Sequence, residues 1–297
     1  MNRREFGQLV STLRQDLDWT QFNLAEFAQV EEAVISQIER GVKKHFEPYL
    51  LFNLANAFQL TTMERREFLL AASGLDNRQM VRQPSSQVKT DVFHPQKTLG
   101  KLIHLIGQLR LPAFMIDVYG DVIAANYIVM TLFQISSDWA MTGVNLPGGY
   151  STIRVTFGQD LISRKMVAEN WDAYALNTMR SFREISLRYR AKPYFKYLIK
   201  AFRNPIEFPL FDRYWKMVSS LEMDKESNAD LFTYEHSRYG PLKYLASSSV
   251  TITPYGELFL VQYLSTDQQT SQVFEQLARE CGQDVASFAP WPEKIIS

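Results

Sequence analysis

The sequence has little of what several classes of protein depend on. Its 297 residues include a single cysteine, Cys281, which excludes an intrachain disulfide framework and a CxxC zinc site and indicates a reducing compartment. Lys and Arg number 32, and Asp and Glu also number 32. No overall positive field therefore exists to hold a polyanion or an acidic membrane surface, and any nucleic-acid contact must come from a local patch.

Long apolar runs and catalytic motifs are also missing. No stretch approaches about 18 consecutive apolar residues, and the N-terminal sequence lacks the uninterrupted apolar core of a signal peptide. The four histidines have no metal-ligand spacing, and no glycine-rich phosphate loop or nucleophile elbow is present. We expect a cytoplasmic protein that is not an enzyme, inserts in no membrane and binds no metal.

What the chain does contain is enough apolar material for a large core. It is 46% hydrophobic and 13% aromatic, which predicts a folded, globular protein, and its length favours two domains. The periodicity of the apolar residues changes after a polar stretch. We expect a first domain over 1–73, a linker over 74–94, a second domain over 95–281 and a tail over 282–297.

The first domain is predicted to be all helical. In residues 1–73 the apolar positions recur at helical spacing in five pieces. Thr20 is placed as an N-cap, Gly41 suits a left-handed stop, Pro48 suits a first turn, and the sequence from Thr61 to Glu64 fits a capping box. The pattern indicates five short helices joined by tight turns.

The segment WTQFNLAEFAQVEEAVISQIERG, residues 19–41, resembles the helix-turn-helix of the lambda-repressor-like (XRE) family. The apolar spacing agrees with that resemblance. Val30, Ile35 and Ile38 are predicted to bury one face of the third helix against Leu24 and Phe27. Short and amide side chains remain on the other face, which can then enter a major groove of double-stranded DNA.

The resemblance implies two sets of DNA contacts. The residues placed at base edges are Glu32, Ala33, Ser36 and Gln37, and those placed at phosphates are Gln21, Arg40, Lys43 and Lys44. Residues 1–73 hold eight Lys or Arg and ten Asp or Glu, so a monomer should bind weakly and a homodimer on a two-part site is expected. A protein-interaction scaffold whose helical domain does not bind DNA stays open as the alternative.

The second domain is predicted to be α+β with an antiparallel sheet. Two short strands flank the turn Tyr119-Gly120-Asp121, and Asn126 caps the helix that follows. Residues 160–220 are mostly helical, and residues 243–265 fit a hairpin whose turn contains Pro254 and Gly256. Strands at both ends of a domain with helices between them indicate a sheet that pairs distant segments.

From residue 112 the chain resembles the ligand-binding domain of MmyB-like transcription regulators, a PAS-like module that follows an XRE helix-turn-helix. The resemblance is carried by LPAFMIDVYGDVIAAN, IRVTF, NWDAYALNTMR, NPIEFPLFDRYW and GELFLVQYLSTDQQTSQVFEQLA, in that order. It implies a ligand-responsive transcription regulator whose sheet can enclose a fatty-acid-like molecule. We expect the linker and the helix at 96–109 to couple the two domains.

Candidate ligand contacts are the bulky residues of the strands and helices and a few polar anchors, since ligand pockets are mostly apolar with few polar groups. The apolar candidates are Phe114, Ile116, Phe133, Trp171, Tyr174, Phe211, Trp215, Val250 and Ile252. The polar candidates are Asn126, Arg154 and Arg180. Each of them fits an ordinary core, ion-pair or cap position equally well. No catalytic cofactor is expected, and a bound fatty acid or similar lipid is the expected small molecule.

Overall fold

A computed structural model describes residues 1–74, 93–136, 143, 146, 148–159, 171–220 and 231–296. It divides the chain into two compact units, neither of which is continuous in sequence. The helical unit contains Met1–Lys89, Arg183–Lys196 and Lys216–Leu221, and the sheet unit contains Thr90–Phe182, Tyr197–Trp215 and Glu222–Ser297. The expected linker falls almost wholly outside the described residues. None of the helices within the described ranges is long and apolar enough to cross a membrane.

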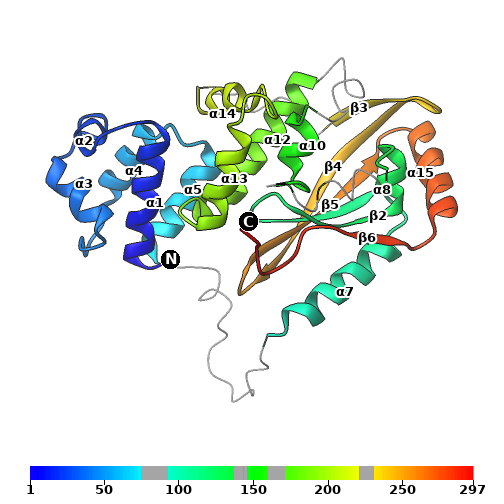
Figure 1. Ribbon diagram of the computed structural model, residues 1–297, viewed down its shortest axis with the longest axis horizontal. Coiled ribbons are helices and arrows are strands. Elements are labelled where there is room, and N and C mark those ends of the chain that lie inside the picture. The colour runs from blue at the N-terminus through cyan, green and yellow to red at the C-terminus, as the bar shows by residue number, and fades with distance from the viewer. Residues whose placement is uncertain are drawn as a thin grey trace. The chain divides into compact units, whose positions relative to one another are not determined.

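The helical unit begins with the five predicted helices (Figure 1), which are α1 (Arg3–Asp16), α2 (Gln21–Ala28), α3 (Glu32–Glu39), α4 (Pro48–Ala57) and α5 (Thr62–Ser73). Thr61 closes a capping box, as predicted, and Thr20, which was predicted as an N-cap, closes one as well. Gly41 follows α3 with φ of 71°. A Cβ there would also lie 2.8 Å from the Cα of Arg4, so both backbone conformation and space favour glycine.

The core of these helices forms from one stripe of each. Leu9, Leu24 and Ile35 are fully buried, which is the arrangement that their helical spacing predicts. The expectation for Phe27 is wrong, because its side chain is 60% exposed and stacks on Trp19 with 4.5 Å between ring centroids. Helix α2 has only eight residues, and its inward stripe is already filled by Leu24, Ala25 and Ala28.

A later segment completes the helical unit. It consists of the end of α12 (Trp171–Ser186), the 3-10 turn η3 (Leu187–Tyr189) and the start of α13 (Pro193–Phe202), and the end of α14 (Phe211–Ser220) also belongs to this unit. Leu187 is fully buried in the same apolar cluster as the residues of α1 to α5. Sequence reasoning did not foresee this packing.

The sheet unit holds six antiparallel strands in the order β3-β4-β5-β1-β2-β6. They are β1 (Ala113–Asp117), β2 (Val122–Asn126), β3 (Leu231–His236), β4 (Gly240–Thr253), β5 (Gly256–Ser265) and β6 (Val285–Ser287). The two predicted strand pairs, β1 with β2 and β4 with β5, are confirmed. Strands β3 and β6 were not predicted, and β6 lies within the expected tail. The fold class is confirmed: a helical N-terminal region followed by an α+β domain.

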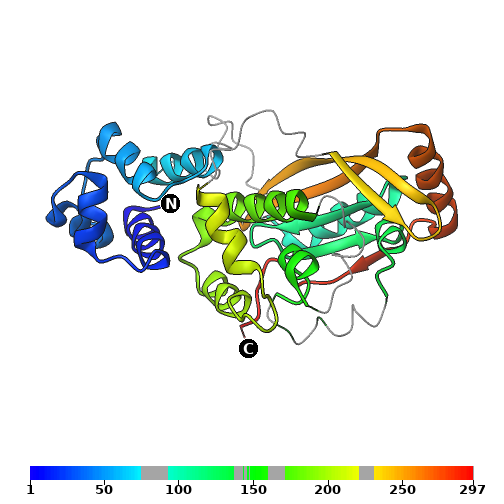
Figure 2. The same cartoon turned by 90° about the horizontal axis from the view of Figure 1, so that it is seen from above.

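Helices that pack with the sheet or border it include α7 (Pro95–Gln108), α8 (Tyr127–Leu132), α10 (Thr152–Phe157) and α15 (Gln268–Cys281). Helix α7, which was predicted, covers one face with Ile106 against Met115 and Ile123. Helices α8 and α15 lie beside one another (Figure 1) and cover the other face, which carries Tyr244 and Tyr263. Seen from above, the long β3–β4 ribbon runs along one edge of the sheet (Figure 2).

Candidate functional site

Helix α3 has a buried face and an exposed face. Ile35 and Ile38 are fully buried, whereas the side chains predicted at base edges lie on the opposite side. Glu32, Ala33 and Gln37 are exposed and Ser36 is half-buried. The helix therefore presents these four residues on one surface, as recognition by a helix in the major groove requires.

Hydrogen bonds to Glu39 hold α3 in place. Its carboxylate accepts from Arg14 Nε at 2.7 Å and Arg14 Nη2 at 3.1 Å, and from Gln21 Nε2 at 2.7 Å. Arg14 also donates to the carbonyl oxygen of Trp19. These bonds tie α3 to α1 and α2, and they use the amide of Gln21, which was predicted at a phosphate. Sequence reasoning missed Arg14 and Glu39, because nothing in their spacing marks them as partners.

The other three residues predicted at phosphates follow helix α3 directly. Arg40 and Lys44 are exposed and Lys43 is half-buried. Arg3 Nη1 donates to the carbonyl oxygen of Lys43 at 2.9 Å, which fixes this loop against the start of α1. At the other end of α3, Glu31 is the N-cap, but its side chain makes no capping hydrogen bond.

In the sheet unit, aromatic side chains gather on the face covered by α8 and α15. Tyr263 lies at their centre, with its ring centroid 4.6 Å from that of Tyr244, 5.8 Å from that of Phe114 and 5.7 Å from that of Phe133. Tyr174 reaches the same cluster through Phe232. Three of the predicted ligand residues, Phe114, Phe133 and Tyr174, are therefore brought together.

Burial raises the pKa of the Tyr244 and Tyr263 hydroxyls well above the usual range of tyrosine. Burial also raises the pKa of Tyr174, although hydrogen bonds with Thr156 and Thr178 oppose the shift. Because these phenols remain neutral at physiological pH, each keeps a hydrogen to donate. Sequence reasoning missed Tyr244 and Tyr263, although each lies in a predicted strand.

The other predicted ligand residues lie elsewhere. Trp171, Phe211 and Trp215 form a second aromatic cluster around Phe157. Ile116 is buried in strand β1. Val250 and Ile252 are each 52% exposed, because the middle of β4 is covered on neither face.

The predicted polar anchors already have partners. Asn126 Oδ1 accepts from the backbone N–H groups of Ala113 and Val129, both at 3.1 Å, and its Nδ2 donates to the carbonyl oxygen of Leu111 at 2.7 Å. Asn126 therefore acts as a helix cap and ties β1 to β2. Arg154 is buried and Arg180 half-buried, and both interact with other parts of the chain.

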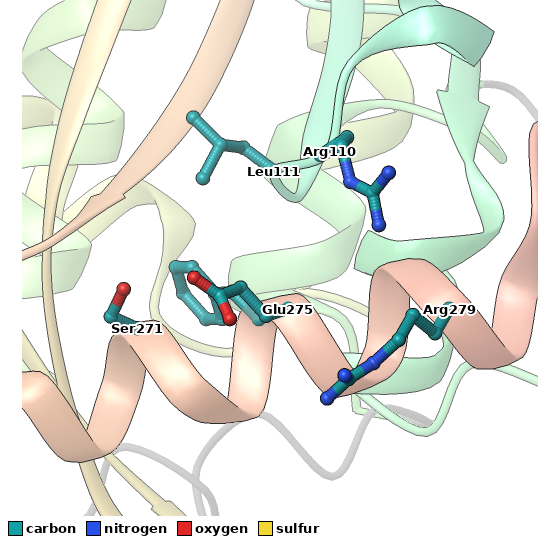
Figure 3. Close-up of a pocket in the computed structure, with 6 residues that line it drawn as sticks. Arg110, Leu111, Ser271, Glu275 and Arg279 are labelled. Carbon is teal, nitrogen blue, oxygen red and sulfur yellow. The ribbon is translucent and has the colours of Figure 1, made fainter.

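A pocket of about 370 Å³ opens between α15 and the loop before β1. Figure 3 shows Ser271, Glu275 and Arg279 along α15, with Arg110 and Leu111 opposite and the guanidinium of Arg110 turned toward the helix. Phe274 completes the lining, and it belongs with Leu111 to the same apolar face as the aromatic cluster. The pocket thus places two arginines beside apolar surface, although Glu275 offsets one of their charges.

A buried ion cluster lies at the turn between β1 and β2. Lys294 Nζ is 2.5 Å from Asp117 Oδ2 and 2.8 Å from Asp121 Oδ2, and Asp117 Oδ1 accepts from the backbone N–H of Tyr119 at 2.9 Å. Burial raises the pKa of Asp117 to about 6, with Lys294 opposing and Asp121 adding to the shift. The two aspartates therefore shape the turn and also hold the C-terminal segment in place.

The chain has a helical region, in which hydrogen bonds hold an exposed helix in place, followed by an α+β region with an aromatic interior. This is the architecture of a helix-turn-helix transcription regulator with a ligand-binding domain. The comparisons with known proteins agree. Residues 101–277, more than half of the chain, match the family described as the MmyB-like transcription regulator ligand binding domain, and the chain belongs to this family. The family predicted from the sequence is thereby confirmed.

One curated relative is the competence pilus inhibition repressor of Acinetobacter baylyi. It is 30% identical to this chain over 105 residues, which are 34% of this chain and 92% of the relative. Because that relative is named as a repressor, this similarity also points to a transcription regulator.

Proposed function

We propose that this transcription regulator binds specific double-stranded DNA through an XRE-type helix-turn-helix and acts as a cytoplasmic homodimer. The observation that carries the proposal is the exposed face of α3, where Glu32, Ala33, Ser36 and Gln37 lie together on a helix held by Glu39. Gln37 can pair with adenine, and Glu32 can accept from the amino group of cytosine.

Charge sets the expected strength of this binding. Lys43 and Lys44 are available for phosphates, but Glu31 and Glu32 are exposed at the N-terminus of α3. Acidic residues there oppose the phosphate backbone, so the affinity of one copy for DNA is low, and it falls further as the salt concentration rises. Two copies on a two-part site compensate for that weakness.

A pair of double variants tests the DNA proposal. Ser36→Ala with Gln37→Ala removes base contacts and should cost the specific fragment about tenfold or more in affinity, while nonspecific binding changes little. Lys43→Gln with Lys44→Gln should weaken binding to all sequences and lower the slope of log affinity against log salt by about two. Sequence-specific retention that survives the first double change would defeat the role given to α3.

We further propose that the sheet unit is a PAS-like sensor of a fatty-acid-like molecule. The neutral hydroxyls of Tyr244 and Tyr263 and the rings around them form an apolar interior that contains hydrogen-bond donors. Arg110 and Arg279 stand where that apolar face meets the surface. A fatty acid whose carboxylate pairs with the two arginines and whose hydrocarbon chain lies against Phe274 fits both the charged and the apolar part of this site.

This second proposal is tested by mass spectrometry of lipid extracted from the purified protein and by titration with saturated fatty acids of about 10 to 16 carbons, whose extended chains are about two to four helix turns long. Arg110→Gln with Arg279→Gln should weaken binding about three- to tenfold, since the arginines are exposed and their pairing is screened. Lys101→Gln, on the exposed side of α7, is the matched control. Absence of any stoichiometric small molecule, with no fatty acid bound, would remove the sensor proposal.

One observation favours the alternative of a protein-interaction scaffold. Four aromatic side chains of α2 and α4 are half exposed or more: Phe22, Phe27, Tyr49 and Phe52. Exposed apolar surface of this kind is typical of protein contacts. Salt-dependent retention of genomic fragments by the full chain separates the two functions, because a scaffold would retain none.

A further inference from the structure

The helical unit contains a surface occupied by a segment of the ligand-binding family domain. Residues 183–196 belong to the family match at 101–277, yet they pack within the helical unit. Leu187 fills that unit's core with no exposed surface. Helix α12 begins at Trp171 in the sheet unit and continues without a break into the helical unit. One helix therefore joins the aromatic residues of the proposed sensor to the helices that carry α3.

Glu64 fixes this segment with both of its carboxylate oxygens. Oε1 accepts from Arg183 Nε at 3.0 Å and from Arg190 Nη2 at 2.5 Å, and Oε2 accepts from Arg183 Nη2 at 3.3 Å. Arg190 Nη2 also donates to the carbonyl oxygen of Arg183 at 2.9 Å, which closes η3 back onto α12. The side chains of Glu64, Arg183 and Arg190 are at most 4% exposed.

The same carboxylate caps helix α5. Glu64 Oε2 accepts from the backbone N–H of Thr61 at 2.9 Å, and Thr61 Oγ1 donates to Glu184 of the docked segment at 3.1 Å. Burial raises the pKa of Glu64, but Arg190, Arg183 and the Thr61 N–H outweigh it and the pKa is lowered overall. The start of α5 and the docked segment therefore depend on one ionised group.

The contacts at the rim are of a different kind. Arg188 Nε lies 2.8 Å from Glu67 Oε2, with side chains 16% and 27% exposed, and Lys192 Nζ lies 3.3 Å from Glu5 Oε1, with side chains 48% and 38% exposed. Ion pairs that water reaches contribute less to stability than buried ones, because solvent screens them. Removing one partner of a buried cluster leaves an uncompensated charge and is far more disruptive. Glu64 is the anchor, and Glu67 offers a matched control one turn along the same helix.

We infer that residues 183–196, anchored by Glu64, are the element that transmits the state of the sheet unit to the DNA-reading helices. This inference rests on the proposed function and replaces the linker and α7 as the expected route of coupling. A ligand that favours one position of α12 would shift the docking of this segment by the difference in its affinity for the two positions.

The test compares the full-length wild type with Glu64→Gln and Glu67→Gln. Glutamine still caps α5 but removes the carboxylate charge that Arg183 and Arg190 share. Amide hydrogen exchange over residues 183–196 should rise about tenfold or more in Glu64→Gln and remain near the wild-type rate in Glu67→Gln. Unchanged protection in α1 to α3 shows that the fold is retained. If Glu64→Gln does not fold, Arg190→Met, which leaves Glu64 paired with Arg183, takes its place.

DNA affinity, measured without ligand and with hexadecanoate, decides the functional part. We expect Glu64→Gln to shift the ligand-free affinity by about threefold or more and to abolish any response to hexadecanoate, while Glu67→Gln shifts it by less than about twofold and keeps the response. The inference would be overturned if Glu64→Gln left hydrogen exchange over residues 183–196 unchanged. It would also be overturned if the segment were released but DNA affinity, or its response to hexadecanoate, remained as in the wild type. A wild type that binds DNA but ignores hexadecanoate counts against the proposed ligand, and the anchor is then judged by exchange and ligand-free affinity.

Discussion

In each of the two units, a cluster of three buried charged side chains holds a segment that is distant in sequence. The central charge is negative in one cluster and positive in the other. In the helical unit one carboxylate, Glu64, lies between two guanidinium groups. In the sheet unit one ammonium group, that of Lys294, lies between two carboxylates. A carboxylate can take up a proton and arginine cannot lose one in this range. At low pH, protonation of one aspartate can therefore relieve the repulsion between the two carboxylates of the sheet cluster. No proton transfer can relieve the repulsion between the two guanidinium groups of the helical cluster.

The pKa shifts follow from this difference. Burial and Asp121 raise the pKa of Asp117 to about 6 despite Lys294. Burial acts in the same direction on Glu64, but two arginines outweigh it and the pKa is lowered. One cluster thus holds a carboxyl group ready to be protonated near neutral pH, and the other keeps its carboxylate ionised.

The largest expected effect is that of Glu64→Gln on stability. Two buried guanidinium groups lose the carboxylate they share, so the free energy of unfolding of the helical unit should fall by about 3–5 kcal/mol, and by no less at pH 5 than at pH 7. Urea unfolding followed by circular dichroism measures the loss. Glu67→Gln should cost at most about 1 kcal/mol; equal losses for both variants would show that burial does not set the strength of this cluster.

A smaller loss is expected for Lys294→Met. At pH 7 the change leaves Asp117 and Asp121 facing one another without a cation, which should cost about 3 kcal/mol. At pH 5 the loss should be smaller, because the two carboxyl groups can share a proton. Urea midpoints at the two pH values test this, with Lys101→Met as the control. A loss that does not depend on pH would contradict the contrast between the clusters.

The smallest effect is the pH dependence contributed by Asp117. Its pKa is raised from 3.8 to about 6, so the folded protein keeps a proton that the unfolded chain has lost between these values. The stability from this group is largest below pH 3.8 and is lost as pH rises through 6. Asp117→Asn, which retains the acceptor for Tyr119, should remove about 1–3 kcal/mol of pH-dependent stability over this range.

Asp212→Asn, a change at an exposed residue, serves as the control for that pH series. Glu64 contributes with the opposite sign, because its pKa is lowered and its contribution disappears as pH falls below the ordinary value of 4.5. Asp117→Asn should make stability fall less steeply with rising pH between 3.8, the ordinary pKa of Asp117, and its raised value of about 6. An equal response to Asp212→Asn would contradict the role given to the buried aspartate.

The helical region was predictable because its signals are local. Thr20, Gly41 and Thr61 each act within one turn of their own position, and the buried stripes follow helical spacing. Phe27 was misplaced because spacing identifies a stripe but not its width. In the sheet unit, β1, β2, β4 and β5 have nearby turn residues, whereas the three-residue strand β6 is defined only by its pairing with β2.

The sites were harder to predict, for a physical reason. A sequence shows which residues carry charge but not which charges meet across more than a hundred positions. Arg154 and Arg180 were chosen as ligand anchors because a carboxylate in an apolar pocket needs a cation. They already interact with other parts of the chain, and the pocket contains Arg110 and Arg279 instead. The contacts of Glu64 with Arg190 and of Asp121 with Lys294 likewise depend on the finished fold.

The most direct test of a ligand-responsive DNA-binding regulator is one titration. Full-length protein is freed of lipid, and its affinity for a retained genomic fragment is measured before and after hexadecanoate or the lipid extracted from the native protein is returned. We predict specific, salt-dependent binding whose affinity changes by about fivefold or more when the lipid is returned. Equal affinity in both states would contradict sensing, and absence of specific retention in both would contradict DNA recognition itself.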